Sequence, residues 1–140
     1  MKGLESNIFS LEGVNVLHRD AAFQEIENNM IIPTRNFIFI SPEYNGSFPG
    51  VLKMLFDTAV SHKIWWYKKA LLTGVATGRA GNLRGMDHLA AVLNHVKITV
   101  HPFQLPISSV DKLMDETGRF TNGNTIKAIN QQLDEFLKWI

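Results

Sequence analysis

Two short polar segments hold the residues that could do chemistry, and each follows directly on an apolar run. The first is SPEYNGS, residues 41–47, and the second is TGRAGN, residues 77–82. Gly46 and the glycines of the second segment permit positive φ or a close approach of the backbone, while Arg79 could meet an anion. Tyr44 offers a flat face, and free backbone N–H groups favour an electron-rich partner. The chemistry indicated is the binding of a planar ring system or a phosphate.

Both segments also have a purely structural interpretation, and the residues alone leave it open. The first segment could be a capped strand-to-helix turn with Tyr44 packed as a lid, and the second could be a plain turn with a solvated Arg79. The second segment does not match the dinucleotide-binding pattern G-x-G-x-x-G, so it gives only weak support for dinucleotide binding.

Other kinds of active site are excluded by composition and spacing. The chain has no cysteine, which excludes a disulfide framework, a thiolate nucleophile and a zinc ribbon. Its five histidines show no metal-ligand spacing, because His88 and His95 lie two turns apart on one predicted helix face. Neither the nucleophile pattern G-x-S-x-G nor a Walker loop occurs. We therefore predict no metal site and no catalytic side chain.

Charge and hydropathy limit the classes of partner that we expect for this chain. The formal net charge is +1 and the basic residues are scattered, so we expect no nucleic-acid partner. Trp65-Trp66-Tyr67 and its neighbouring lysines could stack on bases, but we favour a contact between subunits or a cover over the ligand end of the sheet. No apolar run approaches the ~18 residues of a membrane span, and no signal-peptide core is visible at the N-terminus. We expect one domain over residues 1–140, a cytoplasmic location and no membrane partner.

Apolar patterns predict the elements that position the two segments. Runs of β-favouring residues predict strands at 37–40, 70–77 and 98–100, with a further possible strand at Asn7–Leu11. The helical pattern of apolar residues predicts helices at 21–30, 48–59, 83–96 and 125–139. Asp20 and Ser47 are expected to cap the first two helices. The strand at 37–40 is expected to be buried on both faces, as in a parallel sheet.

The last predicted helix has one apolar face, which consists of Ile126, Ile129, Leu133, Phe136 and Leu137. Because strands alternate with helices along the chain, the fold class is α/β with a mostly parallel sheet. Ligands of such sheets bind beyond the carboxyl ends of the strands. Both polar segments follow strands at that end, so they are expected to share one site.

These residues carry a resemblance to a known family. Residues 41–53, SPEYNGSFPGVLK, closely resemble the P-E-Y-N-G-S-x-P-G-x-L-K signature of the NADPH-dependent FMN reductases. That family has a flavodoxin-like fold and includes azobenzene and quinone reductases. Residues 77–84, TGRAGNLR, are similar to the family's T-x-G-G-x-x-G-G-x-R segment, less closely. The resemblance extends from about Asn7 to Ile140 and implies a three-layer α/β/α flavodoxin-like fold.

The resemblance implies FMN at the rim of the sheet and NAD(P)H as co-substrate. By their positions in the two motifs, the cofactor-binding residues would be Pro42, Glu43, Tyr44, Asn45, Gly46, Thr77, Gly78 and Arg79. The flavin would take hydride from NAD(P)H and pass electrons to a quinone, azo or similar acceptor, so the chemistry would belong to the cofactor. Since family members are commonly dimers or tetramers, the resemblance also implies a homo-oligomer.

One part of the family pattern does not match. Family members begin with a buried strand and a phosphate loop resembling G-S-x-R-x-x-S-x-N, and nothing in residues 1–13 is similar to it. We therefore expect the first, central strand to be missing, which would expose strand edges. Either the chain lacks roughly 30 residues of a longer protein, or it is a shortened member completed by a partner. The alternative function is a flavin-free domain that acts through protein association.

Overall fold

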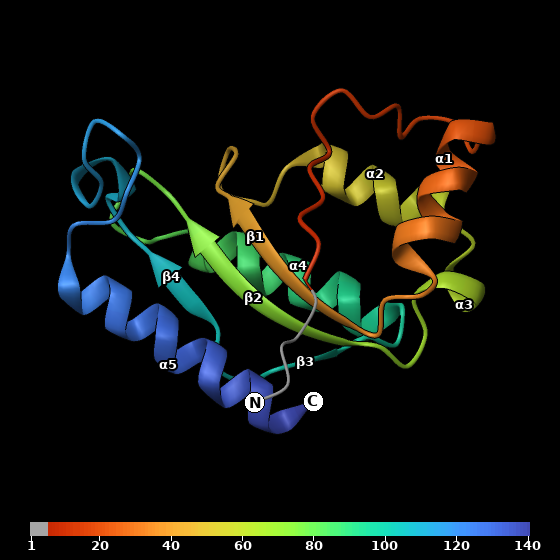
Figure 1. The fold of residues 1–140 in the computed structure, drawn as a ribbon. Coiled ribbons are helices and arrows are strands. Elements are labelled where there is room, and N and C mark those ends of the chain that lie inside the picture. Colours follow the sequence, from red (N-terminus) through yellow and green to blue (C-terminus); the bar gives the residue numbers. More distant parts are fainter. Residues whose placement is uncertain (1–5) are drawn as a thin grey trace.

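A parallel sheet forms the centre of the computed structural model, which describes residues 6–140 (Figure 1). Its strands are β1 (Asn36–Pro42), β2 (Lys69–Val75), β3 (Thr99–Val100) and β4 (Leu105–Ile107). All seven residues of β2 pair with β1, so β3 and β4 share the other edge of β2. β3 lies beside the start of β2 and β4 lies beside its end. The two short strands thus act as one interrupted strand.

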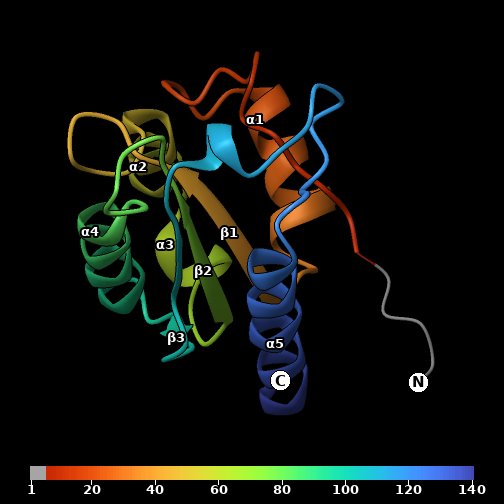
Figure 2. The same ribbon diagram turned by 90° about the vertical axis from the view of Figure 1, so that its left-hand side faces the viewer.

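Helices cover both faces of the sheet. The α-helices are α1 (Ala21–Ile26), α2 (Gly50–Thr58), α3 (Ser61–Ile64), α4 (Leu83–His95) and α5 (Gly123–Trp139). A π-helical turn, η1 (Glu27–Ile31), continues α1, and a 3₁₀ turn, η2 (Val110–Lys112), follows β4. Figure 2 shows the sheet edge-on, with α4 on one side and α5 on the other. The predicted three-layer arrangement with a mostly parallel sheet is confirmed. No helix within residues 6–140 is long and apolar enough to cross a membrane.

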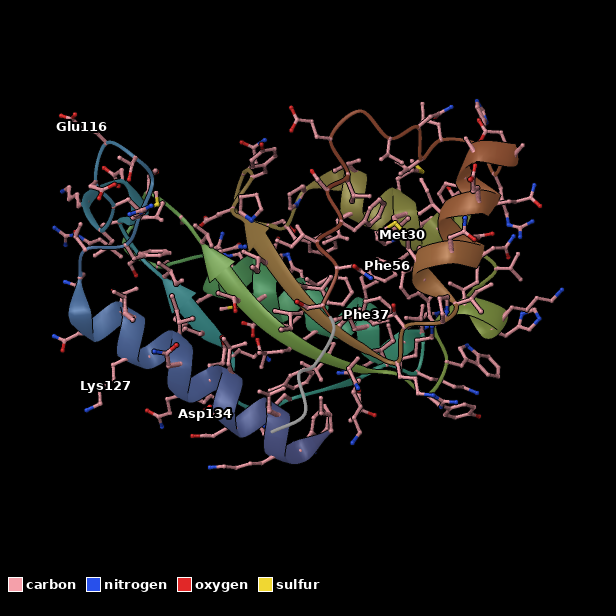
Figure 3. The ribbon with its side chains drawn as sticks, in the orientation of Figure 1. Met30, Phe37, Phe56, Glu116, Lys127 and Asp134 are labelled. Atoms are coloured by element: carbon pink, nitrogen blue, oxygen red, sulfur yellow. The ribbon has the colours of Figure 1, made fainter. Side chains whose placement is uncertain are left out.

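Aromatic side chains of β1 pack against aromatic side chains of α2 and of the residue that follows α3. The ring of Phe37 lies 5.7 Å from that of Trp65, and the ring of Phe39 lies 6.0 Å from that of Phe56. Phe56 and Trp65 contact each other with ring centroids 4.8 Å apart, and both are almost fully buried. Figure 3 labels Phe37 on β1 and Phe56 on α2, and Trp65 contacts both rings. Aromatic pairs in this distance range stabilise a core beyond their simple area burial.

The opposite face of β1 is open, which corrects the prediction of a strand buried on both faces. Ile38 is 47% exposed and Ile40 is 70% exposed. The reason is the position of α5, which packs over β2 and β4 through Gln132 and does not reach β1. The amide of Gln132 donates to the carbonyls of Leu72 and Phe103 at 2.8 and 3.0 Å. Among residues 6–140, nothing pairs with the outer edge of β1, as expected if a central strand is missing.

Two further predictions about elements need correction. Asn7–Leu11 forms no strand, and Ile8 is 98% exposed, so this segment does not pair with the open outer edge of β1. On α5, Phe136 is buried, but Ile126 and Leu137 are exposed. The expected cap at Asp20 is confirmed, since its carboxylate accepts the N–H of Phe23 at 2.9 Å.

The aromatic sequence at 65–67 does not cover the ligand end of the sheet. It lies just before β2 and therefore at the amino end of the strands, opposite the two polar segments. Trp65 is 1% exposed and belongs to the core, whereas Trp66 and Tyr67 are exposed. The idea of a cover over the ligand site is thus wrong, and the idea of a subunit contact stays a prediction.

Candidate functional site

The two polar segments leave the sheet side by side. Pro42 pairs with Val75 in the β1–β2 ladder, and the backbone N–H of Glu43 donates to the carbonyl of Val75 at 2.9 Å. The arrowheads of β1 and β2 in Figure 1 mark this end of the sheet. The expectation that residues 41–47 and 77–82 share one rim is therefore confirmed.

The first segment forms a tight hairpin. Tyr44 and Ser47 exchange two backbone hydrogen bonds, at 2.8 and 3.1 Å. Between them, Asn45 and Gly46 have φ of 52° and 76°, the pattern of a type I′ turn that Asn-Gly favours. The N–H groups of Asn45 and Gly46 donate to no other residue in the described part of the chain. Tyr44 is 62% exposed, so it is not packed as a lid.

Side chains of α4 contact this hairpin, and no local sequence pattern predicts these contacts. The hydroxyl of Ser47 lies 2.9 Å from Nδ1 of His88. Gly46 faces Arg84, because a Cβ at position 46 would lie 3.1 Å from Nη1 of that arginine. The expected N-cap at Ser47 is wrong: Pro49 occupies the N-cap of α2, since the hairpin ends too early for the Ser47 hydroxyl to reach the helix.

Asn82 is the principal structural residue of the second segment. It is fully buried, has φ of 67°, and donates its side-chain N–H to the carbonyl of Ser41 at 2.9 Å. Its Oδ1 is buried and has no hydrogen-bond partner within residues 6–140. Next to it, Gly81 lies so close to β4 that a Cβ would meet Pro106 at 2.8 Å. The segment is thus wedged between the ends of β1 and β4.

Thr77, Gly78 and Arg79 form the exposed part of the second segment. The carbonyls of Gly78 and Arg79 accept hydrogen bonds from the backbone N–H of Ser109 at 3.2 Å and the hydroxyl of Ser108 at 2.7 Å. These serines follow β4 and were not predicted as part of the site. The N–H groups of residues 77–79 have no acceptor among residues 6–140, and a Cβ at Gly78 would meet nothing within 4 Å. Their donors are therefore available to a ligand.

The rim of the sheet brings together hydrogen-bond donors, and not acidic or basic catalytic groups. Two stretches of free N–H groups meet at one rim, and the Arg79 guanidinium forms no ion pair within the described residues. Backbone donors of this kind suit the acceptor-rich edge of a flat ring. No cluster of three or more potential metal ligands occurs in residues 6–140.

Comparison with known proteins identifies the family. The family model described as NADPH-dependent FMN reductase matches residues 8–111. The chain belongs to this family. FMN and NAD(P)H are the cofactors that family membership implies, and it does not favour the flavin-free alternative.

Two curated relatives support this assignment. An NAD(P)H-dependent FMN reductase of Pseudomonas aeruginosa is 35% identical over 108 residues, which cover 74% of this chain and 57% of the relative. A 2-hydroxy-1,4-benzoquinone reductase of a Burkholderia species is 25% identical over 128 residues, covering 86% of this chain and 70% of the relative. The chain therefore spans little more than half the length of the first relative.

Solved structures share the fold. The flavoenzyme NAD(P)H:(acceptor) oxidoreductase FerB of Paracoccus denitrificans superposes with a TM-score of 0.72 at 23% identity, over 86% of this chain and 68% of FerB. The apo form of the NADH:FMN oxidoreductase EmoB gives a TM-score of 0.63 at 18% identity, over 84% of this chain and 59% of EmoB. The flavodoxin-like fold expected from the sequence is confirmed.

The described residues suit the isoalloxazine ring of FMN better than its phosphate. The free N–H groups at 45–46 and 77–79 suit the polar edge of an isoalloxazine ring, and the open side of Gly78 leaves room for a flat group. For the phosphate the fit is poorer. Residues 6–140 contain no segment like G-S-x-R-x-x-S-x-N, and the exposed cations near this rim are Arg79 and Arg84, the latter beside Gly46.

Proposed function

We propose that this chain holds the isoalloxazine ring of FMN in an NAD(P)H-dependent oxidoreductase. The proposal rests on one observation: the Asn45-Gly46 hairpin tip and residues 77–79 present free N–H groups at the same rim of the sheet. The ring would be lined by Pro42, Glu43, Tyr44, Asn45, Gly46, Thr77, Gly78 and Arg79. Because the chain is shorter than its relatives, the proposal concerns only the part of the site that binds the flavin ring.

Each group has a distinct part in this binding. The N–H groups of Asn45 and Gly46 would donate hydrogen bonds to the polar edge of the ring, and the type I′ turn fixes the direction of these groups. Gly78 allows the ring to approach the backbone, and Arg79 balances negative charge on the bound group. When bound, FMN supplies the transfer of two electrons between NAD(P)H and an acceptor. The protein supplies position and electrostatic stabilisation.

We further propose a quinone as the electron acceptor. Support comes from the benzoquinone reductase among the relatives and from the exposed ring of Tyr44 beside the hairpin tip. An aromatic face at the mouth of the site suits stacking against another flat ring. An azo compound has the same planar character and is the comparison substrate. A homodimer or homotetramer in the cytoplasm completes the proposal.

The first experiment is an FMN titration of the purified chain, followed by quenching of flavin fluorescence. We expect a Kd in the micromolar range, since hydrogen bonds of ~1 kcal/mol each act together with the burial of the flat ring against the rim. Arg79→Gln should weaken binding by about tenfold, as the loss of one charge-assisted contact predicts. Lys127→Gln is the matched control, because Lys127 projects from the outer side of α5 (Figure 3).

Binding in the micromolar range would lead directly to an assay of NAD(P)H oxidation with benzoquinone. Absence of binding at several hundred micromolar FMN would overturn the proposal that residues 42–46 and 77–79 suffice to hold the ring. An equal loss of affinity in Arg79→Gln and Lys127→Gln would instead show that net charge, and not the rim, attracts FMN.

A further inference from the structure

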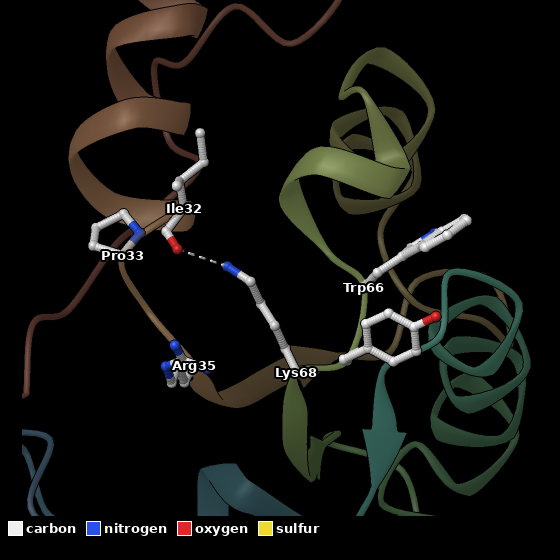
Figure 4. A pocket seen from close by; sticks show the side chains of 6 residues that line it. Ile32, Pro33, Arg35, Trp66 and Lys68 are labelled. Atoms are coloured by element: carbon white, nitrogen blue, oxygen red, sulfur yellow. Dashed lines mark hydrogen bonds between the residues drawn. The ribbon is translucent and has the colours of Figure 1, made fainter.

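A cavity opens at the amino end of the sheet, opposite the rim that holds residues 42–46 and 77–79. It has a volume of about 380 Å³ and lies at the amino ends of β1 and β2 (Figure 4). Two connections line it: the one between η1 and β1, and the one that leads into β2. The lining residues are Ile32, Pro33, Arg35, Trp66, Tyr67 and Lys68. We call this space the amino-end cavity; its volume lies within the range of small-molecule sites in proteins.

Two cations share the amino-end cavity without a counterion. Neither Arg35 nor Lys68 forms an ion pair with any of residues 6–140. Burial and the nearby charge of Arg35 lower the pKa of Lys68 from 10.5 to about 8. Two positive groups that repel each other in a recess gain free energy from any anion that binds between them.

Lys68 retains donor capacity for such an anion. Its ammonium group donates to the carbonyls of Ile31 and Ile32, the second at 3.1 Å, as Figure 4 shows for Ile32. An ammonium group has three N–H bonds, so one donor is left after these two contacts. Arg35 is exposed and carries its full set of guanidinium donors.

The remaining lining is apolar and aromatic. Tyr67 is 79% exposed and Trp66 is 37% exposed, while Ile32 on the other connection is 45% exposed. Lys97 lies with its Nζ 3.4 Å from the centroid of the Trp66 ring and thus brings a third positive charge to this end of the sheet. Flat apolar surface beside unpaired cations is complementary to an aromatic ring that carries an acid group.

We propose that the amino-end cavity binds a small aromatic carboxylate. The guanidinium of Arg35 takes the carboxylate in a two-point contact, and the free N–H of Lys68 adds a charge-assisted bond. The ring of the ligand lies against the exposed face of Tyr67 and the side chain of Ile32. This site is separate from the flavin rim and does not depend on the proposed reductase activity.

A structural role for Lys68 is the competing explanation. In that case Lys68 only stabilises the carbonyl end of η1, as basic residues near helix C-termini do. Arg35 would then have no function in the cavity, and removing its charge would change nothing there. Substitutions at Arg35 therefore separate the two explanations without disturbing the helix end.

The test uses 2-naphthoate as probe and its neutral amide, 2-naphthamide, as the matched control ligand. Binding to the full chain is measured by calorimetry and by backbone amide shifts in NMR spectra. We expect naphthoate to bind in the sub-millimolar range, at least about tenfold tighter than the amide, with shifts at residues 32, 34, 35 and 66–68. Equal binding of acid and amide, or shifts confined to other residues, would overturn the proposal.

Variants of the chain complete the test. Arg35→Gln should weaken naphthoate binding by about tenfold, while Lys127→Gln, which removes the same charge from α5, should not. Tyr67→Asn removes the ring but tolerates the positive φ of 65° at that position, and it should weaken both ligands. If Arg35→Gln binds naphthoate like the unaltered chain, Lys68 has the structural role alone.

The pH dependence provides an independent readout. Arg35, before β1, is the charged group that acts on Lys68. The ammonium of Lys68 also faces the carbonyls of Ile31 and Ile32 and the ring of Phe37, whose centroid lies 5.4 Å away. Because Lys68 loses its proton as the pH rises through about 8, naphthoate affinity should fall over that range. Lys68→Gln should bind weakly at every pH and show no such fall. A pH-independent affinity in the unaltered chain would contradict the proposal.

Discussion

The side-chain amide of Asn82 donates to the backbone carbonyl of Ser41 across 2.9 Å, and this bond joins the start of α4 to the end of β1. Ser41 pairs with Gly74 of β2, and the chain then continues through Pro42 and Glu43, which bond Val75, into the Tyr44–Ser47 hairpin. The bond therefore couples the two halves of the candidate site. Both residues are buried, so no water competes for the interaction.

Replacing Asn82 should loosen the site as well as the fold. Asn82→Gly keeps the left-handed backbone but removes the bond, and we expect a loss of ~1–2 kcal/mol in the free energy of unfolding. Asn82→Ala also places a Cβ residue at φ of 67°, which adds ~1 kcal/mol. Urea unfolding measures both values, and FMN affinity should fall in the same order. Equal stability of all three proteins would show that the bond contributes nothing.

The hairpin tip depends on a glycine. Gly46→Ala puts a side chain at φ of 76° and 3.1 Å from Arg84, so we expect a cost of ~1–2 kcal/mol and weaker FMN binding. Gly123→Ala at the start of α5 is the matched control, because a Cβ there meets nothing within 4 Å. Thermal unfolding and the flavin titration check the pair. A Gly46→Ala chain with unchanged stability and affinity would rule out a strained turn.

Gln132 connects α5 to the sheet through three hydrogen bonds. Its amide donates to Leu72 and Phe103, and its oxygen accepts the hydroxyl of Thr73 at 2.8 Å. Gln132→Leu leaves these groups buried without partners and should lower the free energy of unfolding by ~2–4 kcal/mol. Gln131→Leu, on the exposed side of α5, should change it by less than ~0.5 kcal/mol. Denaturant melts that show the same small change for both would contradict the prediction.

Lys68 should make stability depend on pH in the alkaline range. Its pKa is about 8 in the folded chain, against 10.5 for an ordinary lysine side chain, so the unfolded chain binds more protons between these two values. The free energy of unfolding contributed by this group therefore rises as the pH increases through that window. Lys68→Gln should lack this rise, whereas Lys127→Gln should keep it. Thermal melts at a series of pH values compare the three chains, and parallel curves would refute the assignment.

The alternation of apolar runs was enough to predict the strands and helices around the site, because each buried strand and each amphipathic helix has its own period. β4 was missed because Pro106 interrupts its short sequence, although an edge strand tolerates a proline. The cap at Ser47 was predicted from local preference, but a tertiary contact with His88 uses the hydroxyl instead. Pairing partners far apart in the chain decide such details, and local patterns do not contain them.

Local sequence patterns also predict only part of the candidate site. The glycine and proline pattern located both loops, since it depends on local backbone geometry. The contributions of Asn82, Ser108 and Ser109 depend on the packing of β4 against the second loop, which no local pattern indicates. The exposure of Ile40 likewise depends on which strand and helix lie beside β1.

The parallel pairing of all the strands in the sheet also affects how fast the chain folds. Asn36 pairs with Lys69 and Lys69 pairs with Thr99, so each contact between strands closes a loop of roughly 30 residues. The hairpin at Tyr44–Ser47 is too small to start the sheet, and within residues 6–140 every strand pairs with a strand far away in sequence. Proteins with such contacts fold slowly, because the entropy of the loops is lost before the contacts form. In the partly folded chain, the unpaired edge of β1 is free to pair with other chains. The refolding yield should therefore fall as the protein concentration rises.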